Sequence, residues 1–223
     1  MQDLSLFQVV AVMAIPVLFA ITLHEVAHGW VANWFGDPTA KMLGRLSLNP
    51  LKHVDPVGTV LVPLGLLIVA NLAGAPPFLF GWAKPVPVTV QNLRDPRRDM
   101  SFVALAGPGA NLAMALVWVF VIRVSLWLGD DFGLFALWLM YMGIAGIMIN
   151  VVLMVLNLVP LPPLDGGRVM TSVLPRQAAL RFARIEPYGI VILLVAMISG
   201  VLWRLIGPPI AGLNGLLFGL SGL

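Results

Sequence analysis

A charged motif interrupts a long apolar segment at Ile21-Thr22-Leu23-His24-Glu25-Val26-Ala27-His28-Gly29-Trp30. On an α-helix, His24 and His28 lie one turn apart on the same face, so both imidazoles can reach one metal ion. Glu25 projects beside them, where it can take a proton from a metal-bound water. Each ionisable side chain at membrane depth costs roughly 2.5–3.5 kcal/mol, so three within five residues need a compensating partner. The motif predicts a zinc site; the alternative is a buried helix of a soluble protein with two hydrogen-bonded histidines.

The composition is that of a polytopic membrane protein. Of the 223 residues, 60% are apolar and 10% are charged, whereas soluble domains carry about 25% charged residues. Mean hydropathy is +0.97. We therefore expect an all-α membrane protein, a single domain over residues 1–223 embedded in a lipid bilayer. The thirteen Lys and Arg residues cluster in loops, which is typical of topology signals and predicts no nucleic-acid partner.

The apolar runs predict about four full transmembrane helices. They cover residues 4–35, 101–128, 133–159 and 187–206. Residues 168–186 carry four arginines and predict one amphipathic helix at the membrane surface. The Gly- and Leu-rich tail over 207–223 favours no particular structure.

The remaining segments predict less regular structure. Residues 44–48 alternate in polarity, and residues 85–90 (Pro-Val-Pro-Val-Thr-Val) are typical of extended chain, so both predict short membrane-associated β-strands. Residues 57–82 are apolar but interrupted by glycine and proline. We expect this segment to be re-entrant; a full crossing is the alternative.

A catalytic zinc ion needs three protein ligands and a water. After His24 and His28, the candidates are His53 and the acidic residues. Most acids lie in loops of mixed charge, but Asp165 follows a span directly, in an apolar frame of proline and glycine. This placement favours Asp165 as the third ligand, with His53 as the alternative.

Two motifs resemble the site-2 protease family of intramembrane zinc metalloproteases: His24-Glu25-Val26-Ala27-His28 and Asn157-Leu158-Val159-Pro160-Leu161-Pro162-Pro163-Leu164-Asp165-Gly166. They match the family's His-Glu-x-x-His and Asn-x-x-Pro-x-x-x-Leu-Asp-Gly hallmarks in the expected order. A third stretch, Gly107-Pro108-Gly109-Ala110-Asn111, is similar to a small-residue/Asn element of that family. The chain resembles a compact member without a PDZ or cystathionine-synthase-type domain.

The resemblance implies a zinc-dependent intramembrane metalloendopeptidase with one Zn²⁺ per chain. It implies His24, His28 and Asp165 as ligands, and Glu25 as the general base. The expected substrate is a transmembrane protein, cut within or near a membrane segment. Candidates for substrate binding or oxyanion stabilisation are Asn157, His53 and Asn111, although the small-residue/Asn element can also be read as close helix packing.

Topology and rival functions complete the expectations. The loops over 83–100 and 165–186 hold eight of the thirteen Lys and Arg residues. The positive-inside rule then predicts a protein of the cell membrane with its active site nearer the cytoplasmic face. A zinc or ion transporter and a catalytically silent membrane scaffold are the alternative functions.

Overall fold

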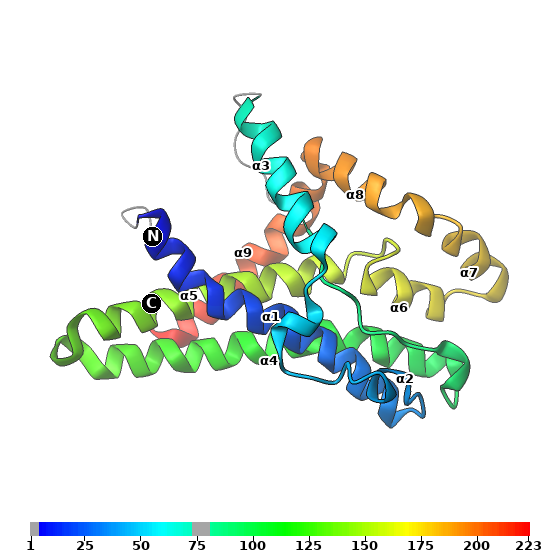
Figure 1. The fold of residues 1–223 in the computed structure, drawn as a ribbon, viewed down its shortest axis with the longest axis horizontal. Coiled ribbons are helices and arrows are strands. Elements are labelled where there is room, and N and C mark those ends of the chain that lie inside the picture. The colour runs from blue at the N-terminus through cyan, green and yellow to red at the C-terminus, as the bar shows by residue number, and fades with distance from the viewer. Residues whose placement is uncertain (1–4, 73–80) are drawn as a thin grey trace.

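The computed structural model describes residues 5–72 and 81–223, and it is built of helices (Figure 1). Within these residues, four helices are long and apolar enough to cross a membrane. They are α1 (Leu6–Trp34), α4 (Pro96–Leu128), α5 (Gly133–Asn157) and α9 (Val201–Ser221). The prediction of an all-α integral membrane protein with four spans is confirmed.

A hairpin of α4 and α5 forms the centre of the fold. The short helix η4 (Gly129–Phe132) joins the two. Glycines on α5 allow α4 and α5 to pack closely. A Cβ on Gly143 would overlap the side chain of Ile122 on α4, and a Cβ on Gly146 would overlap Trp118 on α4. Small residues at such contacts stabilise helix pairs in lipid, where close packing replaces the hydrophobic driving force.

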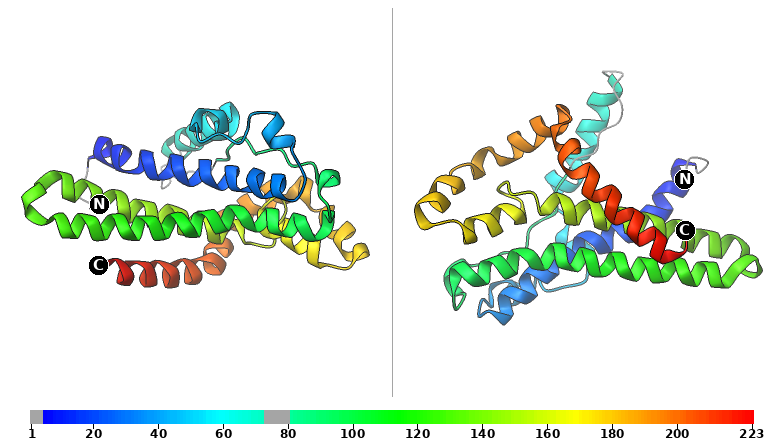
Figure 2. Two further views of the ribbon diagram at one scale, coloured as in Figure 1. Left: turned by 90° about the horizontal axis from the view of Figure 1, so that it is seen from below. Right: turned by 180° about the vertical axis from the view of Figure 1, so that it is seen from behind.

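The helices α1 and α9 cover opposite sides of this hairpin, so the spans form three layers (Figure 2). Both α1 and α5 run opposite to α4, and therefore parallel to each other (Figure 1). One apolar core joins the layers; its buried members include Val12, Ile122, Ile147 and Leu217.

Local signals fix both ends of α1. At its start the Ser5 hydroxyl accepts a hydrogen bond from the Gln8 backbone N–H, and the Gln8 side chain accepts one from the Ser5 N–H. At its end Gly36 has φ +107°, a conformation that suits glycine. Trp30 and Trp34 in the last turns are 54% and 72% exposed.

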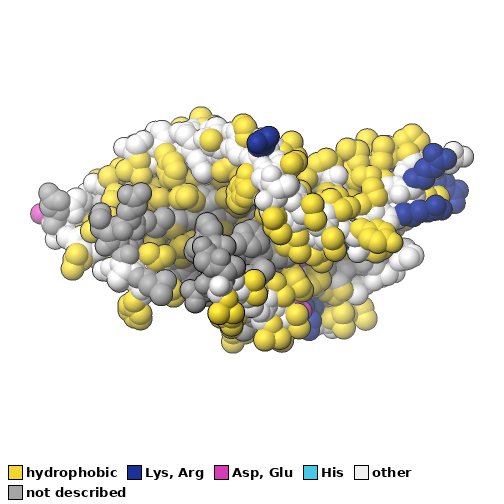
Figure 3. Space-filling view, turned by 90° about the horizontal axis from the view of Figure 1, so that it is seen from above, with side chains coloured by type: hydrophobic (Ala, Val, Ile, Leu, Met, Phe, Trp, Pro, Cys, Tyr) yellow, Lys and Arg dark blue, Asp and Glu magenta, His cyan; other side chains and the backbone are white. Residues whose placement is uncertain are grey.

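A lateral arm of three short helices connects α5 to α9. It contains α6 (Asp165–Val173), α7 (Arg176–Ala183) and α8 (Gly189–Ile198). The predicted single surface helix over 168–186 is therefore two helices, because Leu174 takes an extended conformation before Pro175. Figure 3 shows Lys and Arg side chains gathered at the end of the molecule where α7 lies.

The arm is joined to the first turn of α4. The Arg97 guanidinium donates to the Ser172 carbonyl oxygen, with Nε 2.7 Å away, and to the Leu174 carbonyl oxygen. These carbonyls belong to the C-terminal end of α6, where helical partners are missing. The contact places the two arginine-rich loops at the same end of the bundle.

The fourth span differs from the predicted residues 187–206. Gly200 takes φ +75° and separates α8 from α9. The ten residues of α8 measure about 15 Å, half of the roughly 30 Å hydrocarbon core. The helix α9 instead extends to Ser221 through Pro208 and Pro209, and its Leu202 and Leu217 side chains are buried. The apolar run concealed a glycine turn, which is why its boundaries were predicted wrongly.

Neither predicted β-strand occurs in the residues that the structure describes. Residues 44–48 are irregular, and residues 81–89, here called the extended segment, lead into the short helix η3 (Val90–Asn92). In the extended segment Pro85 and Pro87 have no N–H to donate. The Val86 N–H donates to the Glu25 carboxylate instead of to a neighbouring strand. The prediction of strands is therefore wrong.

The re-entrant segment is also not supported. Residues 57–82 start within a π-helical turn, η2 (Pro56–Leu61), and continue as α3 (Val62–Leu72); residues 73–80 lie outside the described residues. The helix continues through Pro63 and Gly65, so these residues do not turn the chain back.

Asp37 fixes the far end of the extended segment. Its carboxylate accepts hydrogen bonds from Thr39, from the Thr89 N–H at 2.7 Å and from the Asn92 amide at 3.0 Å. Burial alone would raise the pKa of Asp37, but the hydrogen bonds from Thr39, Asn92 and Thr89 outweigh it and lower the pKa. The carboxylate therefore stays ionised and holds the segment against the end of α1.

Candidate metal centre

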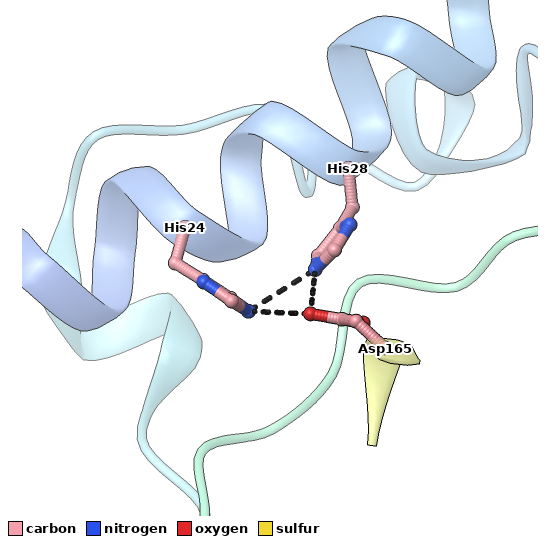
Figure 4. Close-up of side chains that lie close together, drawn as sticks. All are labelled: His24, His28 and Asp165. Carbon is pink, nitrogen blue, oxygen red and sulfur yellow. Dashed lines mark hydrogen bonds and ion pairs between the residues drawn. The ribbon is translucent and has the colours of Figure 1, made fainter. Parts of the chain in front are cut away.

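Three buried side chains converge on one point (Figure 4). His24 and His28 come from α1, and Asp165 is the first residue of α6. The two imidazole Nε2 atoms are 3.1 Å apart. Asp165 Oδ2 lies 3.2 Å from His24 Nε2 and 3.3 Å from His28 Nε2. Among residues 5–72 and 81–223, this is the one group of at least three His, Cys, Asp or Glu side chains that could hold a metal ion.

The helix α4 packs directly against both imidazoles. A Cβ on Gly107 would overlap ring atoms of His24 and His28. Only glycine leaves room for the rings at this contact, so Gly107 determines how closely α4 approaches them.

The outer nitrogen of each imidazole faces an oxygen atom. His28 Nδ1 lies 2.7 Å from the Val103 carbonyl oxygen, and His24 Nδ1 lies 2.6 Å from Asn111 Oδ1. A backbone carbonyl can only accept, so His28 carries its hydrogen on Nδ1 and presents the lone pair of Nε2 to the cluster.

Close backbone contacts fix the loop that carries Asp165. A Cβ on Gly167 would overlap the backbone of Pro162, and a Cβ on Gly189 at the start of α8 would overlap the Pro162 carbonyl oxygen. The loop is therefore held between α6 and α8, which leaves little freedom for the carboxylate to move away from the imidazoles.

The geometry of this group fits zinc. Zinc bonds of about 2.0–2.1 Å to nitrogen and oxygen place tetrahedral ligand atoms about 3.3 Å apart. The three separations are 3.1, 3.2 and 3.3 Å. Two imidazole nitrogens and one carboxylate oxygen form a donor set that zinc binds with a fourth position open to water.

Comparisons with known proteins agree with this chemistry. Residues 132–199, which include all of α5 and Asp165, match the family model described as "Peptidase family M50". Over 209 residues the chain is 36% identical to the Bacillus subtilis protein named "Putative zinc metalloprotease YwhC", covering 87% of this chain and 85% of that protein. This chain belongs to peptidase family M50.

Further relatives support the same family. The Mycolicibacterium smegmatis protein named "Putative zinc metalloprotease Rip2" is 32% identical over 187 residues, covering 84% of this chain and 66% of that protein. A Mycobacterium tuberculosis protein of the same name is 27% identical over 194 residues, with 83% and 66% covered. No solved structure matches the chain.

As an M50 protein, the chain is a zinc-dependent membrane metalloprotease of the site-2 type, and the resemblance carried by its two motifs is confirmed. Its cofactor is zinc, which the geometry of the three converging side chains also favours.

Glu25 lies beside this group on α1 and is half-buried. One of its carboxylate oxygens, Oε2, accepts a hydrogen bond from the Val86 N–H at 2.9 Å. The extended segment thus fixes one side of the carboxylate. The other oxygen remains available as a proton acceptor.

Of the other candidate residues, only Asn111 contacts this group among the residues that the structure describes. Asn157 Nδ2 donates to the Leu153 carbonyl oxygen of its own helix at 2.9 Å. His53 Nε2 donates to the Ser47 carbonyl oxygen at 2.8 Å, and His53 is not part of the metal group. Asn111 is fully buried beside His24.

The Val103 carbonyl and Asn150 contribute to the hydrogen bonds around the two histidines but were not among the candidate residues predicted from the sequence. The Val103 carbonyl that fixes His28 carries no sequence signal, because every residue has a backbone carbonyl. Asn150, which hydrogen-bonds to Asn111, could have been noticed as a polar residue within an apolar span.

Proposed function

We propose that this M50 protein hydrolyses a peptide bond within or near a transmembrane segment of another membrane protein. The observation that carries the proposal is the convergence of His24, His28 and Asp165 within 3.3 Å, with Glu25 next to His24 on the same helix. In this assignment the first three residues hold zinc and Glu25 is the general base.

Zinc, when bound, supplies a Lewis acid that polarises the scissile carbonyl and lowers the pKa of a water molecule. Glu25 takes a proton from the attacking water and returns it to the leaving amine. The Val86 N–H at 2.9 Å from Oε2 orients the carboxylate, so that Oε1 accepts the proton.

We assign Asn157 as a donor to the substrate carbonyl. Its amide has two N–H groups, and the bond to the Leu153 carbonyl uses one of them. The second N–H can bind a substrate oxygen as negative charge develops on it.

The substrate helix has to unwind, because a helix hides its own amides. The extended segment beside Glu25 is our first candidate for pairing with the unwound peptide, and residues 44–48 are the second. Since Val86 donates its N–H to Glu25, Val88 is the nearest residue of the extended segment that has its own N–H for pairing. Unchanged cleavage by Val88→Pro would contradict the first candidate.

We place the protein in the cell membrane with the metal centre nearer the cytoplasmic face. The two arginine-rich loops lie at the same end of the bundle, since Arg97 binds the carbonyls of Ser172 and Leu174. The positive-inside rule assigns such an end to the cytoplasm. The zinc ligands lie in the half of α1 nearer that end.

Glu25→Gln tests the proposal. Glutamine keeps an oxygen that can accept from Val86, so the fold and about one zinc per chain should be retained. Cleavage of a generic transmembrane-helix substrate in detergent should fall by about 10²–10⁴-fold, the usual contribution of a general base. Glu186→Gln is the matched control, because Glu186 is exposed on the arm.

Three results would contradict the proposal. Wild-type protein without zinc would remove the metal-site assignment. Zinc in both proteins, with equal cleavage by wild type and Glu25→Gln, would exclude Glu25 as the base. Zinc with no cleavage of any membrane substrate would favour the ion-transport alternative.

A further inference from the structure

Two buried asparagines connect the metal centre to the central hairpin. Asn111 on α4 and Asn150 on α5 are both 0% exposed. Asn111 Oδ1 lies 2.6 Å from His24 Nδ1, and Asn111 Nδ2 donates to Asn150 Oδ1 at 2.9 Å. Burying amides in apolar surroundings costs free energy unless every polar group is hydrogen-bonded. A buried series of hydrogen-bonded amides therefore calls for an explanation beyond packing.

The direction of each hydrogen bond follows from one backbone carbonyl. Asn150 Nδ2 lies 2.8 Å from the Gly146 carbonyl oxygen, which can only accept. Asn150 therefore directs its NH₂ group towards Gly146 and its oxygen towards Asn111. Asn111 must then direct its own NH₂ group towards Asn150 and its oxygen towards His24.

A second carbonyl supports the same orientation of Asn111. Asn111 Nδ2 lies 3.3 Å from the Ala20 carbonyl oxygen on α1, which again can only accept. The orientation of a buried amide is assigned from its hydrogen-bond network, and here two acceptors, Ala20 and Asn150, agree.

The consequence for His24 is chemical. An oxygen facing Nδ1 requires a hydrogen on Nδ1, which leaves Nε2 free to offer its lone pair to a metal ion held between the imidazoles and Asp165. Without a metal ion, Nε2 can instead donate a hydrogen to Asp165 Oδ2 at 3.2 Å. With the amide of Asn111 reversed, an N–H would face Nδ1 and favour the hydrogen on Nε2, where it would block metal binding. His28 reaches the same state more simply, through the Val103 carbonyl.

We propose that Asn111 and Asn150 are positioning residues that hold His24 in the tautomer and orientation needed to bind zinc. This proposal rests on the assignment of His24 as a zinc ligand. The Gly146 carbonyl on α5 fixes the orientation of the Asn150 amide. The Asn150 amide fixes the orientation of the Asn111 amide on α4, and the Asn111 oxygen in turn faces His24 on α1.

The first test measures zinc affinity by competition with a metal chelator. Asn111→Leu keeps a similar volume but no oxygen, and zinc affinity should fall by about 10–100-fold, as when other hydrogen-bond partners of metal-bound histidines are removed. Asn150→Leu should lower it by about 10-fold, although Asn150 touches neither histidine. Ser125→Ala is the matched control: it removes the 2.6 Å hydrogen bond from Ser125 to the Ala136 carbonyl, another buried contact between α4 and α5, and should leave zinc affinity unchanged.

The second test observes the tautomer of His24 directly. The chain has three histidines, so ¹⁵N-histidine labelling gives few signals, and His24→Leu identifies those of His24. The comparison is made in a metal-free Asp165→Leu background, because the Asp165 carboxylate 3.2 Å from His24 Nε2 would itself favour a hydrogen on that atom. There His24 should carry its hydrogen on Nδ1. In Asn111→Leu the signals should shift towards a mixture of tautomers, which a loss of packing alone would not produce.

The outcomes separate this proposal from the function it rests on. Unchanged zinc affinity in His24→Leu would overturn the metal-site assignment and the positioning role together. Loss of zinc in His24→Leu, with unchanged affinity and tautomer in both asparagine variants, would overturn the positioning role alone. A neutral His24 with its hydrogen on Nε2 in the metal-free Asp165→Leu variant would also overturn it.

Discussion

Gly107→Ala is the most direct test of how the metal centre is built. The substitution adds one methyl group on α4 at the contact with the two imidazoles. The new Cβ would lie 2.6 Å from His24 Cε1, and closer still to His28 Nε2. Neither ring can retreat freely, because Asn111 and Val103 hold their outer nitrogens.

The size of the effect follows from these distances. Ordinary van der Waals contact begins at 3.4 Å, so the distance between α4 and the His24 ring must increase by about 0.8 Å. A metal–ligand bond tolerates a deviation of only about 0.2 Å. Removing a hydrogen-bond partner of a metal ligand typically lowers metal affinity by about 10–100-fold. The Gly107→Ala substitution should lower zinc affinity by more than this, because it displaces the rings themselves. The free energy of unfolding should fall by at most about 2.5 kcal/mol, because overpacking costs about 1–3 kcal/mol and alanine stabilises a helix by about 0.5–1 kcal/mol over glycine.

The assay combines zinc content and chelator competition with thermal unfolding in detergent. Gly109→Ala is the control, since a Cβ there has open space and the position is on the same helix. We expect Gly109→Ala to bind zinc like wild type. If Gly107→Ala did so as well, the close approach of α4 to the imidazoles would be refuted.

Two further predictions concern the segments around the site. Gly189→Ala should displace the Pro162 carbonyl and lower both zinc content and cleavage. Gly212→Ala is the control, because the added Cβ has open space there, and it should change neither. Equal behaviour of the two variants would argue against the role of Gly189 in holding the loop that carries Asp165. The pKa of Asp37 is lowered in the folded protein. The stabilisation that the Asp37 carboxylate gives to the extended segment is therefore fully present above the pKa of an aspartate in the unfolded chain, about 3.9. It is lost as the pH falls through the lower pKa of the folded protein. The protection of the extended segment against hydrogen exchange, measured relative to an unstructured chain at the same pH, should therefore be unchanged between pH 7 and 5 and be lost only in stronger acid. A loss of protection already at pH 6 would show that another group holds the segment.

The convergence of the three candidate ligands could be predicted from sequence because each of them has a local signal. His24 and His28 need only a helix to share a face, and Asp165 stood out by its apolar surroundings. The partners of the imidazoles were harder to predict. Asn111 was noticed only as part of a small-residue element, and its role depends on how α1, α4 and α5 pack.

The errors share one physical cause: apolar composition does not report where a chain turns. Gly200 breaks an apolar run that looks continuous, whereas Pro208 and Pro209 do not interrupt α9. The strand prediction failed for a related reason. The alternation of residues 85–90 suggested pairing between strands, but the partners of Val86 and Thr89 are carboxylates on or just after α1.

If the proposed function holds, the exposed tryptophans at the end of α1 have a consequence for where a transmembrane substrate would be cut. Exposed tryptophan is typical of the membrane–water interface. His28 and His24 precede Trp34 by six and ten residues, which corresponds to about 9–15 Å along the helix. A helical substrate beside α1 would therefore present bonds about six to ten residues inside its own membrane boundary. Water needs to travel only this distance, from the tryptophan side, and the other half of the bilayer can stay dry.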